Sequence, residues 1–136
     1  MVTSPSVDLL EEIRAALDTL EPLLVGRTVD IEMSRLHVLA DPMLFRRVFA
    51  ERFASALARS EPSDAITVRV SRTGKAARIE VINEGGHVAG DDLPDLGAAG
   101  DEFRAMGGDI GTAGPLRVIC WMTLPLAPGA SSAADA

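Results

Sequence analysis

The sequence is poor in cysteine, histidine and aromatic residues. Cys120 is the single cysteine among 136 residues, so no internal disulfide can form, and a lone thiol fits a reducing compartment such as the cytoplasm. The two histidines, His37 and His87, add too few and too scattered donors for a zinc site. These shortages exclude a disulfide-stapled secreted domain and predict no metal centre.

Positive charge and long apolar runs are also scarce. The chain carries 13 Lys and Arg against 20 Asp and Glu, a formal charge of -7, which argues against nucleic acid or an anionic membrane as a general partner. No apolar run is long enough to span a bilayer, and the N-terminus lacks the basic region and apolar core of a secretion signal. With 47% hydrophobic residues, the chain suits one folded domain with a real core. We expect a cytoplasmic protein without membrane insertion.

Apolar residues at helical spacing predict two long helices. The first covers residues 7–25. The second covers residues 41–59, where Asp41 is a good N-cap and Pro42 suits the first turn. A short third helix is expected within residues 91–106, before a pair of glycines.

Strictly alternating segments predict strands, including a hairpin that turns at Gly74. The expected strands cover residues 29–33, 37–39, 66–70, 77–81 and 118–124. Together these elements predict an α+β fold, a two-layer sandwich of a mixed sheet of about five strands packed on about three helices. This domain would cover residues 1–126, and the Ala-, Ser- and Gly-rich residues 127–136 would form a disordered tail.

One side of the predicted sheet carries an apolar patch among polar residues. The side away from the helices would present Thr67, Arg69, Arg78 and Glu80, together with Ile82, Ile119 and Trp121. The last three residues form a candidate partner-binding surface, and coverage by the tail or by a lost neighbour is the alternative.

The order of helix, hairpin and amide-plus-glycine motif resembles the ATP-binding, ATPase-like domain of sensor histidine kinases. These domains have the Bergerat fold and belong to the superfamily that includes gyrase. Asp41-Pro42 matches the opening of the family's N-box helix. Asn83-Glu84-Gly85-Gly86-His87 stands where the family has Asp-x-Gly-x-Gly, and Gly107-Gly108-Asp109-Ile110 matches its C-terminal part. The second glycine box, Gly-x-Gly-Leu, has no convincing match, and Leu96-Gly97-Ala98-Ala99-Gly100 is the nearest candidate.

The resemblance implies a set of site residues. The magnesium-ligand asparagine of the N-box helix corresponds to Ser55, and the general base of hydrolysing and anti-sigma relatives corresponds to Glu51. Phosphate charge would need a balancing cation, for which Arg47 and Arg59 are the candidates. The aspartate that accepts from the adenine amino group corresponds to Asn83, and Gly85 is the first glycine of the box.

Each departure from the family pattern weakens nucleotide binding. Ser55 has a shorter reach than asparagine, and loss of the charge at Asn83 weakens a charge-assisted hydrogen bond by roughly 1 kcal/mol. Loss of the glycine-rich turn removes backbone amides that cradle phosphates. The alternatives are structural: Glu51 as a solvated i,i+4 partner of Arg47, and Asn83 with Gly85 as a turn that ends a strand.

The sequence therefore predicts a histidine-kinase ATPase-like domain with a degraded nucleotide pocket. It would act by protein contact in a phosphorelay or partner-switching pathway, as a pseudokinase or phosphotransfer accessory without a cofactor. Its partner would be a response regulator, a kinase or a sigma/anti-sigma component, and self-association stays open. The alternative is a functional ATP- and magnesium-binding catalytic domain of a split sensor kinase, or an anti-sigma-type serine kinase that uses Glu51.

Overall fold

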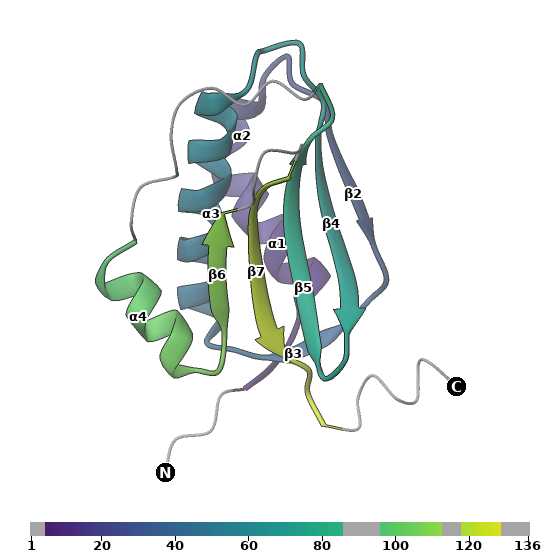
Figure 1. The fold of residues 1–136 in the computed structure, drawn as a ribbon. Coiled ribbons are helices and arrows are strands. Elements are labelled where there is room, and N and C mark those ends of the chain that lie inside the picture. The colour runs from purple at the N-terminus through teal and green to yellow at the C-terminus, as the bar shows by residue number, and fades with distance from the viewer. Residues whose placement is uncertain (1–4, 86–95, 113–117, 129–136) are drawn as a thin grey trace.

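A computed structural model describes residues 5–85, 96–112 and 118–128 of the protein, without the side chains of Val118 and Ile119. Helices cover one face of a five-stranded sheet, which makes the two layers predicted from the sequence (Figure 1). In chain order the elements are β1 (Ser6–Asp8), α1 (Leu9–Thr19), α2 (Glu21–Leu24), β2 (Val29–Met33), β3 (His37–Leu39), α3 (Pro42–Arg59), β4 (Ile66–Thr73), β5 (Ala76–Asn83), α4 (Ala98–Ala105), β6 (Asp109–Thr112) and β7 (Val118–Pro125).

The main sheet is mixed and has the strand order β2-β4-β5-β7-β6. β2 and β4 are parallel, whereas the other neighbours are antiparallel. The β4–β5 hairpin turns at Gly74, whose φ of 62° suits a residue without a side chain. β6 is a short edge strand that the sequence did not predict, because four residues carry too little alternation to be recognised.

The two long helices, α1 and α3, begin directly after the capping residues Asp8 and Asp41. Asp41 Oδ1 accepts from the backbone N–H groups of Met43 and Leu44 at 2.9 and 3.3 Å, as an N-cap should. The predicted helix over residues 7–25 is wrong at both ends. Val7 lies in β1, and α1 ends at Thr19, before a separate helical turn with Pro22 near its start. None of the helices in the described part of the chain is long and apolar enough to cross a membrane.

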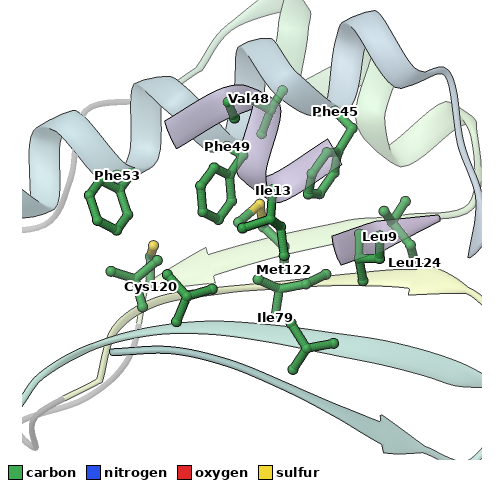
Figure 2. Close-up of a cluster of buried hydrophobic side chains, with 14 of the residues drawn as sticks. Leu9, Ile13, Phe45, Val48, Phe49, Phe53, Ile79, Cys120, Met122 and Leu124 are labelled. Atoms are coloured by element: carbon green, nitrogen blue, oxygen red, sulfur yellow. The ribbon is translucent and has the colours of Figure 1, made fainter. Parts of the chain in front are cut away.

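The core lies between the helices and the sheet. Phe45, Phe49 and Phe53 stack along α3, with ring centroids 5.8 and 5.7 Å apart. Their rings point towards the sheet, where Ile79 and Met122 lie opposite them (Figure 2). All five side chains are completely buried, so this face of α3 fixes the helix against the strands.

The two ends of the described chain meet at β3. Pro5 accepts from the backbone N–H of Ala40 at 3.0 Å, and β1 pairs antiparallel with β3. On the C-terminal side, Leu126 bridges to Val38, and Ala127 donates its N–H to the carbonyl of His37 at 2.9 Å. Ala127, where the predicted tail begins, is buried at this contact, and residues 129–136 lie outside the described residues.

Candidate functional site

The residues predicted on α3 lie on a face that is partly open to solvent. Ser55 and Arg59 are half-buried, whereas Glu51 is exposed. Arg47 Nε lies 3.6 Å from Glu51 Oε1, and the two side chains are 65% and 49% exposed. This contact is the i,i+4 ion pair that the sequence offered as the structural alternative to a general base.

Asn83 ends β5 on the side of the sheet that faces the helices. It is paired with Ile66 across the hairpin and is completely buried. Its amide Nδ2 donates to Asp64 Oδ2 at 2.9 Å, and its carbonyl Oδ1 accepts from the backbone N–H of Gly85, also at 2.9 Å. Asn83 and Gly85 thus form the strand-ending turn that the sequence offered as the structural alternative, and a carboxylate from another loop joins them.

Asp64 is the member of this group that the sequence analysis missed. It lies in the loop that joins α3 to β4, and its exposed fraction is 4%. Its Oδ2 also accepts from the backbone N–H of Glu61 at 3.0 Å. A Cβ on Gly85 would overlap the Asp64 carboxylate, so only glycine fits at residue 85 in this conformation. In the sequence, Asp64 lies in a turn-forming stretch before a predicted strand. That pattern predicts a loop at residue 64, but it does not predict the contact with Asn83.

Arg52 is a second residue that the sequence analysis did not single out. It is only 8% exposed and lies close enough to Cys120 to act on the thiol. Burial raises the pKa of Cys120 to about 12, although the Arg52 charge lowers it by a smaller amount. The Arg52 charge on α3 therefore acts on β7 at Cys120, which pairs with Val81, two residues before Asn83.

The candidate for the second glycine box stands at a helix start. α4 begins directly after Gly97, which has φ 60° and ψ -130°, and Asp101 N–H donates to its carbonyl at 3.1 Å. Among the described residues, no group of three His, Cys, Asp or Glu side chains could hold a metal ion. Gly86 and His87 of the first glycine box lie outside the described residues.

The candidate partner surface on the outer side of the sheet is smaller than predicted. Ile82 is only 1% exposed, so its side chain cannot form part of an open patch, and the side chain of Ile119 lies outside the described part of the structure. Trp121 is half-buried, and the Arg78 guanidinium lies 4.9 Å from the centroid of its ring. The indole covers Gly111 on the neighbouring strand, where an added Cβ would overlap it.

Comparisons of the sequence and of the structure with known proteins both find histidine kinases. No family model matches the chain. The sensor histidine kinase CusS of Escherichia coli O157:H7 is 28% identical over 92 residues, which is 66% of this chain and 19% of CusS. The mycobacterial sensor histidine kinase MprB matches with a TM-score of 0.72 and 16% identity, over 92% of this chain and 99% of that one. The histidine kinase ThkA, solved in complex with the response regulator protein TrrA, matches with a TM-score of 0.70 and 16% identity, over 93% of this chain and 42% of that one.

The element order, the mixed sheet and these matches agree with the resemblance found in the sequence. The chain spans about a fifth of CusS, so its likeness concerns one part of that protein. The domain has the α+β fold of histidine kinase catalytic domains.

Proposed function

We propose that this domain is a histidine-kinase ATPase-like module with a degraded nucleotide pocket, which acts by contact with another signalling protein. The observation that carries the proposal is the state of Asn83. The residue that corresponds to the adenine-reading aspartate is completely buried, and both of its polar atoms have partners within the protein. An adenine amino group would need an acceptor at this place, and an aspartate with its charge would supply a stronger one.

The α3 residues support the same proposal. A metal-bridged triphosphate needs hard oxygen ligands, and the family's ligand asparagine is replaced by Ser55, which reaches less far. Glu51, the counterpart of the general base, forms an exposed ion pair with Arg47. Such a pair is usual on a solvated helix face, and it needs no catalytic role.

The class of partner follows from a related complex. The structure of ThkA that this domain matches contains the response regulator protein TrrA, so a histidine kinase with this fold can engage a response regulator. We propose a protein of that class as the partner of this chain, in a phosphorelay or partner-switching pathway. Two features support the phosphorelay or pseudokinase role: the pocket residues are substituted, whereas the order of helices and strands of the family is kept.

Calorimetric titration of ATP with magnesium into the purified protein tests the proposal. We expect no detectable binding at millimolar ATP and no stabilisation against heat. Binding in the micromolar range would refute the degraded pocket and favour an ATP-dependent catalytic domain. In that case Glu51→Ala tests the enzyme: loss of turnover would identify the base, whereas Arg47→Ala is the matched control that breaks the same ion pair.

A further inference from the structure

β2 forms one edge of the five-stranded sheet, and its outer side is open to a further strand. It pairs with β4 on its inner side, and no other strand in the described part of the chain pairs with it (Figure 1). Its five residues include no proline, lysine or bulge, which are features that usually protect the edge of a sheet. The backbone of β2 can therefore exchange hydrogen bonds with an added strand.

The register shows which backbone groups lie on this edge. The carbonyl of Thr28 accepts from the N–H of Ile66 at 2.9 Å, so the backbone groups of Thr28 point towards β4. Because these groups alternate along a strand, Val29, Ile31 and Met33 direct their N–H and C=O groups to the open edge. Each of these three residues thus offers one donor and one acceptor to an added strand.

The side chains of β2 divide into an apolar row and an acidic row. Val29, Ile31 and Met33 pack against the core but are only half-buried, so a further strand with apolar residues on this side would complete their burial. Asp30 and Glu32 are exposed on the opposite side of the sheet. An added strand with basic residues on that side would place unlike charges next to each other.

Antiparallel pairing would bring the acidic row closest to the added strand. Ile31 would then lie in a hydrogen-bonded pair, and Asp30 and Glu32 in the other type of pair, in which the side chains approach more closely. Glu32 already has an ion pair with Arg69 at 3.1 Å, but its side chain is 54% exposed and has room for a second cation. Asp30 has no ion-pair partner in the described part of the chain.

A second copy of this chain does not fit the same edge. Antiparallel pairing of two β2 strands about Ile31 would place Asp30 of one copy opposite Glu32 of the other. Like charges directly opposite each other destabilise a pair of strands, and the chain as a whole has a net charge of -7. Charge therefore favours a basic segment of another protein over self-association at β2.

We propose that β2 is a docking edge for an extended segment of a partner protein in which Lys or Arg alternates with apolar residues. The segment adds to the sheet as a further strand, antiparallel to β2, with its basic side chains opposite Asp30 and Glu32. Its apolar side chains cover Val29, Ile31 and Met33 on the side of the helices. The inference rests on the proposed contact with another signalling protein, but not on the state of the nucleotide pocket.

Two synthetic peptides test this edge: Thr-Val-Lys-Ile-Lys-Val-Thr and its acidic counterpart Thr-Val-Glu-Ile-Glu-Val-Thr. Each peptide carries a fluorescent label and is titrated with the full chain at low salt, with fluorescence anisotropy as the readout. We expect the basic peptide to bind about tenfold more tightly than the acidic one, because two cross-strand charge pairs change from unlike to like. Added salt should weaken the binding of the basic peptide. Equal binding of the two peptides, or binding of neither, would overturn the inference.

Charge-reversal variants locate the binding. Asp30→Lys should remove the preference between the two peptides, since one basic and one acidic side chain, that of Glu32, then form the row. Asp18→Lys is the matched control, because Asp18 is exposed on α1 and the change in net charge is the same. We expect this control to keep the preference of the wild type. Loss of the preference in both variants would show that only the overall charge matters, and would refute a site at β2.

A modified peptide tests the added strand without any change in the protein. Methylation of the backbone N–H of the central isoleucine removes the donor to the Ile31 carbonyl but keeps all charges, so we expect binding about tenfold weaker. Hydrogen exchange should show that the amides of Val29, Ile31 and Met33 become protected when the basic peptide binds. An unchanged affinity after methylation, or protection confined to other strands, would contradict strand addition at β2.

The outcomes are separate from those for the proposed function. Failure of both peptides to bind overturns this inference and leaves a protein-contact role at another surface standing. Binding of ATP would refute the degraded pocket without any effect on β2. Protection of the same three amides at high protein concentration without peptide would show that a second copy occupies the edge, and would overturn the choice of a basic partner.

Discussion

The contact between Trp121 and Gly111 allows a sharp prediction of non-additive stability. The indole covers Gly111 on the next strand, and a Cβ there would lie 2.5 Å from one ring atom and 2.8 Å from the ring nitrogen. Gly111 does not have a positive φ, so alanine is allowed by its backbone and only the indole obstructs it. We therefore expect Gly111→Ala to destabilise the wild type but not the Trp121→Ala variant.

The magnitudes follow from burial. A tryptophan buries about 150–250 Å² when fully covered, so a half-buried one contributes roughly 2.5 kcal/mol at about 25 cal/mol per Å². The Arg78 guanidinium over the ring adds about 0.5–1 kcal/mol. Forcing a methyl group under the indole should cost about 1–3 kcal/mol. Without the indole the same change should be neutral or stabilise by about 0.5 kcal/mol, because glycine weakens a strand.

Urea denaturation of the wild type, both single variants and the double variant gives the coupling energy. We expect it to be at least about 1 kcal/mol, with the double variant more stable than the sum of the single changes implies. Gly26→Ala is the control: its φ of 77° makes alanine strained, and nothing lies within 4 Å of the added Cβ. Its cost should be the same with and without Trp121. Additive effects of Gly111→Ala and Trp121→Ala, within about 0.5 kcal/mol, would show that the indole does not cover Gly111.

Three further predictions concern the interior. Because burial raises the pKa of the Cys120 thiol to about 12, iodoacetamide at pH 8 should not label it in the native protein but should label it in denaturant; rapid native labelling would contradict the burial. Because the pKa of this thiol is higher in the folded than in the unfolded protein, its contribution to stability is complete below the unfolded pKa, near pH 9, and is lost as the pH rises towards 12. The urea midpoint of the wild type should therefore fall over this pH range more steeply than that of Cys120→Val. Phe49→Ala should lower the free energy of unfolding by about 3–5 kcal/mol, since the ring is buried between Phe45 and Phe53; a loss below about 1 kcal/mol in a urea titration would refute this packing.

The sequence predicted the elements whose residues carry a strong local period. α3 was found with its N-cap Asp41, and the β4–β5 hairpin was found with its turn, because capping chemistry and alternation act over a few neighbouring residues. β1 was missed, since Val7 continues the apolar spacing of the following helix and only its distant partner Val38 makes it a strand.

The site was predicted less completely for the same reason. Asn83 and Gly85 were found through a motif that lies in one stretch of chain. Asp64 was not, because its partner lies 19 residues away and only the strand register brings them together. Alternation alone predicted that Ile82 lies in an exposed patch. Alternation predicts the side of the sheet on which a residue lies, but not whether other residues cover it, and Ile82 is buried.

The meeting of both chain ends at β3 has a mechanical consequence. β1 lies along one side of β3, and Leu126 and Ala127 bond to its residues through a bridge and a backbone hydrogen bond. β1 and the end of β7 both lie at the end of the molecule where β3 lies (Figure 1). A force that pulls these two segments apart therefore acts on the hydrogen bonds of β3, together with the one that the Leu126 N–H donates to the carbonyl of Lys75 in the β4–β5 turn.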